Sequence, residues 1–190
     1  MRSDNLYELP KDLPVPQDDG ACRHLPGLTL PRLALISTAG RTVDLSALPG
    51  VTVVYCYPRT GRPDQELLPG WNAIPGARGC TPQSCAFRDH FEELKRAGAA
   101  QVFGLSTQDT AYQREAVERL HLPFELLSDD KLALAQALKL PTFEVAGMRL
   151  IKRLTLIARG GVIEKVFYPV FPPDRNAGDV LAWLKQNRRA

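Results

Sequence analysis

Long hydrophobic runs are absent from this sequence of 190 residues. The best candidate is the short run VTVVYCY at positions 51–57, far below the roughly 20 apolar residues that a membrane-spanning helix requires. The N-terminal stretch MRSDNLYELPKDLPVPQDDG carries charges every few positions and lacks the apolar segment of a secretory signal peptide. We therefore expect a cytoplasmic protein without a membrane partner.

An excess of charge of one sign is missing as well. The 24 basic and 21 acidic residues are scattered along the chain and leave a net charge of only +3, too weak and too mixed to indicate nucleic-acid binding. Neither a G-x-G-x-x-G pattern nor a P-loop occurs. The sequence therefore indicates a globular protein that works without a metal, flavin or nucleotide cofactor.

The order of the predicted elements favours one α/β domain behind an extended arm. Residues 1–27 are rich in proline and charge and predict an N-terminal arm that lies over a domain at residues 28–190. Alternating strands and helices follow a buried strand at 51–57, an order typical of a parallel sheet. We expect a thioredoxin-like α/β/α sandwich. Its other elements are a hairpin (33–37 and 43–45), strands at 101–106 and 124–127, helices at about 110–120, 130–138 and 177–186, and a second hairpin (153–158 and 162–168).

A long loop precedes the helix that carries two of the four cysteines. Residues 58–79 contain four prolines and four glycines, a density that blocks both helix and sheet. Thr81 is then a candidate helix cap with Pro82 at the first helical position, and apolar residues at 87, 91 and 94 share one face until Gly98 ends the helix. Cys80 is therefore expected at a helix N-terminus.

The four cysteines are the residues at which we expect chemistry. In a reducing compartment, cysteines are more often catalytic or metal-binding than part of a disulfide framework. A thiol reacts as its thiolate, which the unpaired N–H groups of a helix N-terminus and the nearby Arg78 would stabilise at Cys80. The alternative is an ordinary thiol at a helix entry. Cys56 within its strand is interpreted as a buried apolar residue and Cys22 as a bystander, and neither is assigned a role.

The segment GCTPQSCAFRD at 79–89 resembles the active-site signature of the Q-type peroxiredoxins, also called bacterioferritin-comigratory proteins. Its C-x4-C pair is the specific part, and the resemblance extends from about residue 33 to residue 168. It implies a thioredoxin fold, Cys80 as the peroxidatic cysteine, Cys85 as the resolving cysteine and Arg153 as the arginine that holds peroxide and thiolate. The reductant that it implies is thioredoxin or a similar dithiol protein.

Arg153 is also chemically suited to the role that the resemblance implies. A guanidinium offers five donors in a fixed fork and stays protonated, so it can bond a thiolate and polarise a peroxide oxygen together. On the predicted strand its side chain points the opposite way from those of Lys152 and Leu154. The alternative is a charge at the strand edge that faces water.

The sequence departs from the family pattern at the usual Pro-x3-Thr-x2-Cys motif. Twenty residues, 59–78, lie between Pro58 and Gly79, and the position three before the peroxidatic cysteine is Ala77, so the customary threonine is unassigned. Thr60 either folds back to donate a hydrogen bond to the peroxide or is a solvated loop residue. Backbone N–H groups of residues 75–79 are a further source of donors. The insertion is also a candidate rim that restricts which hydroperoxides enter.

The resemblance and the cysteine pair together predict a thiol-dependent peroxidase that reduces hydrogen peroxide or organic hydroperoxides. Cys80 would become a sulfenic acid, Cys85 would condense with it to a disulfide, and thioredoxin or glutaredoxin would restore both thiols. The alternatives are a thiol-disulfide oxidoreductase, whose usual pair is C-x-x-C, and a non-catalytic module with zinc held by the cysteines. The sequence leaves open the preferred peroxide, the reductant and the oligomeric state, which is either a monomer or a weak homodimer.

Overall fold

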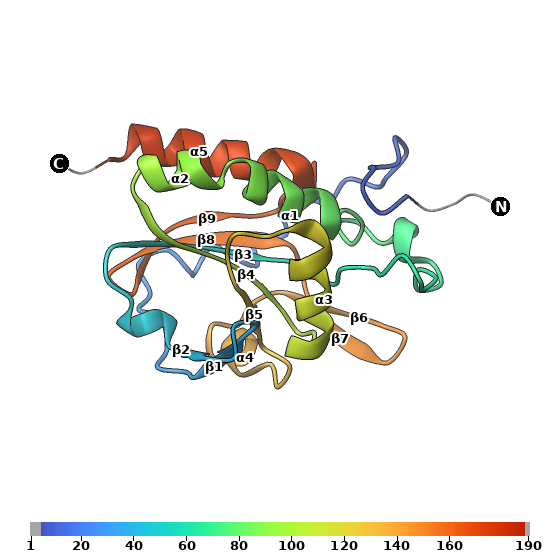
Figure 1. Ribbon diagram of the computed structural model, residues 1–190, viewed down its shortest axis with the longest axis horizontal. Coiled ribbons are helices and arrows are strands. Elements are labelled where there is room, and N and C mark those ends of the chain that lie inside the picture. Colours follow the sequence, from blue (N-terminus) through green and yellow to red (C-terminus); the bar gives the residue numbers. More distant parts are fainter. Residues whose placement is uncertain (1–4, 189–190) are drawn as a thin grey trace.

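The computed structural model describes residues 5–188, and a seven-stranded mixed sheet lies at its centre (Figure 1). The strand order is β2-β1-β5-β4-β3-β8-β9, in which β3, β4 and β5 run parallel and the other neighbours pair antiparallel. The strands are β1 (Leu35–Ser37), β2 (Thr42–Val43), β3 (Val51–Cys56), β4 (Ala99–Ser106), β5 (Leu126–Ser128), β8 (Leu154–Arg159) and β9 (Val162–Phe167).

Helices cover both faces of this sheet, and a large hydrophobic core lies on each face. The helices are α1 (Cys80–Asp89), α2 (Phe91–Arg96), α3 (Thr110–Leu120), α4 (Ala133–Ala137) and α5 (Asn176–Gln186). Figure 1 shows α1, α2 and α5 above the sheet and α4 below it. Side chains of β3 alternate between the cores, with Tyr55 in the one that contains Phe87 of α1 and Cys56 in the one that contains Leu134 of α4. This is the α/β/α sandwich that the sequence predicts.

The helix that carries Cys80 differs from its prediction at both ends. It begins at Cys80 itself, one residue before the predicted cap Thr81, because Gly79 adopts a φ of 106° at the N-cap position. It ends before His90, and Phe91 begins the separate helix α2. Pro82 is tolerated in the first turn because an N–H at that position would have no partner within the helix.

Three other elements differ from the sequence-based expectation. Helix α4 is shorter than predicted because Leu132, directly before it, has a positive φ of 57°. Arg153 lies in a bend just before β8 and not within the strand. A second sheet of two strands, β6 (Thr142–Val145) and β7 (Met148–Ile151), was missed, although both residues of its Ala146-Gly147 turn have the positive φ of a tight hairpin.

The N-terminal arm is attached to the domain at several points. Its described part, residues 5–27, contains no helix or strand, and residues 1–4 of the predicted arm lie outside the described range, as do residues 189–190 of the predicted domain. Leu25 is buried in the core, and a Cβ added to Gly79 would lie 2.7 Å from Cδ2 of Leu9. The arm therefore passes directly against the start of α1. None of the helices in the described chain is long and apolar enough to cross a membrane.

Candidate active site

Cys80 is buried at the first position of α1, with 3% of its surface exposed. Its Sγ lies 3.2 Å from Nη2 of Arg153 and 3.7 Å from the carbonyl oxygen of Ala77. Within residues 5–188, the N–H groups of Cys80 and Thr81 have no hydrogen-bond partner, as expected for the first turn of a helix. Unpaired N–H groups and a guanidinium both favour negative charge, so this position suits a thiolate.

The guanidinium of Arg153 is buried and held by several acceptors. Its Nη1 donates to Oε1 of Gln83, and its Nη2 donates to the carbonyl oxygens of Ala77 at 3.0 Å and Arg78 at 3.2 Å. Only 3% of Arg153 is exposed, so the alternative of a strand-edge charge in water is wrong. A guanidinium stays protonated even when buried, and the fold therefore fixes a positive charge beside the sulfur of Cys80.

Gln83 is a site residue that the sequence analysis missed. Its Nε2 donates to Oδ1 of Asn176 at 3.0 Å, and Oγ1 of Thr155 donates to the same oxygen at 2.6 Å. These three side chains are almost fully buried, and their hydrogen bonds orient the Gln83 amide so that its oxygen faces Arg153. One signal was available, because Gln83 lies three residues after Cys80 and so on the same side of the helix.

Cys85 is half-buried on the same helix, and all four cysteines are free thiols. Burial raises the pKa of the Cys85 thiol, an effect that the nearby Arg88 partly opposes. A rise of about 1.5 Å and a rotation of about 100° per residue put the Cα atoms of Cys80 and Cys85 roughly 8 to 9 Å apart. A disulfide spans at most about 7 Å between Cα atoms, so the two sulfurs cannot bond while this helix is intact.

Thr60 is fully buried, so its interpretation as a solvated loop residue is wrong. Its hydroxyl donates to Oε1 of Gln108 at 3.1 Å, and its backbone N–H donates to the same oxygen at 3.0 Å. A hydroxyl has one proton to donate, and here that proton is directed to Gln108. The predicted role of Thr60 as a donor to the peroxide stays a prediction. Among the backbone donors of residues 75–79, the N–H of Ala77 is bonded to the carbonyl of Ile74.

The other two cysteines belong to the core on the opposite face of the sheet from Cys80. Burial raises the pKa of Cys22 to about 12 and also raises that of Cys56, so both are protonated thiols at neutral pH. Within the described residues, no group of three or more His, Cys, Asp or Glu side chains is placed to hold a metal ion. The zinc alternative therefore has no site in this part of the chain.

Comparisons with known proteins point to one family. Residues 25–181 match the Redoxin family. The chloroplastic peroxiredoxin Q of Oryza sativa subsp. japonica is 32% identical over 160 residues, which cover 84% of this chain but 66% of the rice protein, slightly under two thirds of its length. Chloroplastic peroxiredoxin Q of Sedum lineare is 31% identical over 84% of this chain and 77% of its own.

Solved structures agree with these relatives. The peroxidoxin BcpB of Mycobacterium tuberculosis superposes with a TM-score of 0.70 at 25% identity, over 87% of this chain and 100% of that one. A peroxiredoxin Q of Xanthomonas campestris superposes with a TM-score of 0.67 at 24% identity, over 87% and 98% of the two chains. The second likeness concerns the fold alone.

Proposed function

This chain belongs to the Redoxin family, among the peroxiredoxin Q proteins, and we propose that it is a thiol-dependent peroxidase that reduces hydroperoxides through Cys80 and Cys85. The observation that carries the proposal is the 3.2 Å contact between Nη2 of Arg153 and Sγ of Cys80 at the start of α1. This arrangement supplies what a peroxidatic thiol needs, which is a stabilised thiolate and donors for the oxygen that leaves. It requires no cofactor.

In the first step, the Cys80 thiolate attacks the distal oxygen of the hydroperoxide. An S–O bond forms while the O–O bond breaks, and the electron pair leaves on the other oxygen, which takes up a proton and departs as water or an alcohol. The sulfur is thereby oxidised to a sulfenic acid and the peroxide is reduced. Arg153 stabilises the negative charge as it moves from sulfur to oxygen, and the N–H groups of Cys80 and Thr81 supply further donors.

In the second step, the thiolate of Cys85 attacks the sulfenic acid of Cys80. An S–S bond forms, and the hydroxyl group leaves with a proton as water. Because the two cysteines are too far apart in the intact helix, the first turns of α1 must open before this bond forms. A dithiol protein, thioredoxin or glutaredoxin, then attacks the disulfide, becomes oxidised itself and restores both thiols.

Consumption of hydroperoxide coupled to a reductant tests this proposal. We expect steady turnover with thioredoxin and thioredoxin reductase, or with glutaredoxin and glutathione, and no turnover by Cys80→Ser in either system. The proposal is contradicted if the wild-type protein consumes no hydroperoxide in either system. If that protein instead reduced disulfide substrates, it would be the thiol-disulfide oxidoreductase that the sequence left as an alternative.

A cytoplasmic location and a monomeric or weakly dimeric state are part of the same proposal. The second part is supported by the contacts around Cys80, which in the described residues come from this chain alone. Cell fractionation tests the location, and sedimentation at several protein concentrations tests the oligomeric state.

A further inference from the structure

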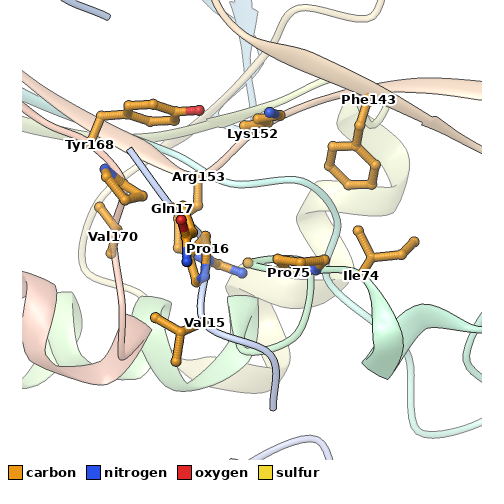
Figure 2. A pocket seen from close by; sticks show the side chains of 12 residues that line it. Val15, Pro16, Gln17, Ile74, Pro75, Phe143, Lys152, Arg153, Tyr168 and Val170 are labelled. Carbon is orange, nitrogen blue, oxygen red and sulfur yellow. The ribbon is translucent and has the colours of Figure 1, made fainter. Parts of the chain in front are cut away.

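A cavity of about 350 Å³ lies beside Arg153, and the N-terminal arm forms part of its wall (Figure 2). Figure 2 shows the arm segment Val15 to Gln17 in the middle of the view, with Ile74 and Phe143 to its right and Tyr168 and Val170 to its left. Its volume is within the range of pockets for small organic ligands, whereas a water molecule occupies only about 30 Å³ in the liquid. Hydrogen peroxide, with two heavy atoms, would leave most of it empty.

The walls of the cavity are mainly apolar. The arm contributes Val15 and Pro16, the insertion contributes Ile74, and β6 contributes Phe143. Two of the polar groups at its edge already have a partner, because Lys152 Nζ and Tyr168 OH both donate to the carboxylate of Asp19, at 3.1 and 2.9 Å. The cavity therefore offers mainly apolar contact to a ligand, and the charge that faces it is the guanidinium of Arg153.

The cavity is next to the reacting sulfur. Arg153 lines it, and Nη2 of the same guanidinium lies 3.2 Å from Sγ of Cys80. One side chain, that of Arg153, therefore contacts both the cavity and the sulfur, and it is the side chain that would stabilise the leaving oxygen. Hydrogen peroxide has no apolar surface to place against these walls, but an organic hydroperoxide has.

On the basis of the function proposed above, we propose that this cavity holds the apolar body of an organic hydroperoxide, and that Val15 and Pro16 of the arm determine the specificity. These two residues lie outside the part of the chain that matches the Redoxin family, residues 25–181. They are held in place from both sides, because Asp19 is bonded to Lys152 and Tyr168, and Pro16 lies against Gly76 of the insertion. The arm and the insertion together build a substrate wall on the common domain.

The test compares second-order rate constants for cumene hydroperoxide and hydrogen peroxide, in the wild type and in the double variant Val15→Ser/Pro16→Ser. An apolar contact worth about two buried methylene groups changes a rate by about tenfold. We therefore expect the ratio of the cumene hydroperoxide rate to the hydrogen peroxide rate to fall about tenfold in the double variant. The matched control is Ile36→Ser, which removes another exposed apolar side chain, on β1.

Two outcomes would overturn this inference. If neither rate constant changes, the arm does not contact the substrate. If both fall by the same factor, the arm only positions Cys80 and Arg153. A protein that reduces neither peroxide instead contradicts the proposed function. In that case, calorimetry with cumyl alcohol and the full-length Cys80→Ser protein still tests the cavity: binding that the arm substitutions weaken supports it, and absence of binding contradicts it.

Discussion

The replacement Arg153→Lys removes the planar fork of the guanidinium but keeps a positive charge beside Cys80. Arg153 donates to Gln83, to two backbone carbonyls and to the sulfur. A lysine has its three donors on one nitrogen and cannot reach acceptors that lie on different sides of a guanidinium. A buried acceptor without a partner costs about 1–3 kcal/mol, so leaving two acceptors without partners lowers the free energy of unfolding by about 2–6 kcal/mol.

The same replacement is also expected to slow the reaction with peroxide. Loss of one donor that stabilises developing charge costs about two to three orders of magnitude, and we expect the second-order rate constant with peroxide to fall by about that amount. Stopped-flow experiments measure this rate constant, under conditions in which a urea titration shows that the variant is folded. Slower alkylation of Cys80 by iodoacetamide would show that less thiolate is present.

The control for Arg153 is Arg149→Lys. Arg149 lies on β7, is largely exposed and pairs with Glu144 at 2.6 Å, so its replacement is expected to leave the rate unchanged. A wild-type rate in folded Arg153→Lys would refute the argument that the fork matters. An equal rate loss in Arg149→Lys would show that the loss in Arg153→Lys does not come from its contact with the sulfur.

Four further predictions follow from the same geometry. Cys85→Ser reduces about one equivalent of peroxide and accumulates sulfenic acid at Cys80, which mass spectrometry detects. This prediction is contradicted if full thioredoxin-coupled turnover persists when Cys22 and Cys56 are also replaced. Hydrogen exchange over residues 81–90 is faster in the disulfide form than in the reduced form, and equal protection with a confirmed Cys80–Cys85 bond argues against opening of α1. Because burial raises the pKa of the Cys85 thiol, its thiolate is scarce at neutral pH and becomes more abundant as the pH rises. When protein whose Cys80 is already a sulfenic acid is jumped to different pH values, disulfide formation is therefore faster at higher pH, and a rate that does not depend on pH contradicts this. Thr60→Val keeps the peroxide rate within a few-fold and lowers the free energy of unfolding by about 1 kcal/mol, because Gln108 loses one donor; a hundredfold slower rate means that Thr60 serves the peroxide after all.

The sequence predicted well those elements whose limits depend on their own residues. Helix α3 spans Thr110–Leu120 as expected, because the Asp109 side chain caps the N–H of Tyr112 and the apolar residues Ala116 and Leu120 share one face. The central strand β3 was likewise predicted from its β-branched and aromatic run. Local propensity was sufficient in both cases because no distant segment competes with it.

The parts that could not be predicted depend on contacts between distant segments. Gln83 faces Arg153 because Asn176 holds its amide from the other side, 93 positions along the chain. The start of α1 shifted to Cys80 because Gly79 packs against Leu9 of the arm and Pro173, where any larger residue would collide. No pattern within the segment 79–89 predicts these partners. The site residues other than the cysteines and Arg153 could therefore be identified only from the structure.

The contacts of Ala77 at this site are made by its backbone and do not depend on the threonine that is missing there. The carbonyl of Ala77 accepts from Nη2 of Arg153 and lies 3.7 Å from the sulfur of Cys80, and neither contact needs a side chain at this position. In the first turn of α1, Pro82 has no N–H and the N–H of Gln83 is bonded to Gly79, so within this turn the amide donors left for a peroxide oxygen are those of Cys80 and Thr81. Their positions are fixed by the helix, and that of Arg153 by Gln83 together with the last two carbonyls of the loop, those of Ala77 and Arg78. An insertion of 20 residues can therefore reshape the entrance, as Ile74 does in the cavity beside Arg153, without changing the donors at which the O–O bond breaks.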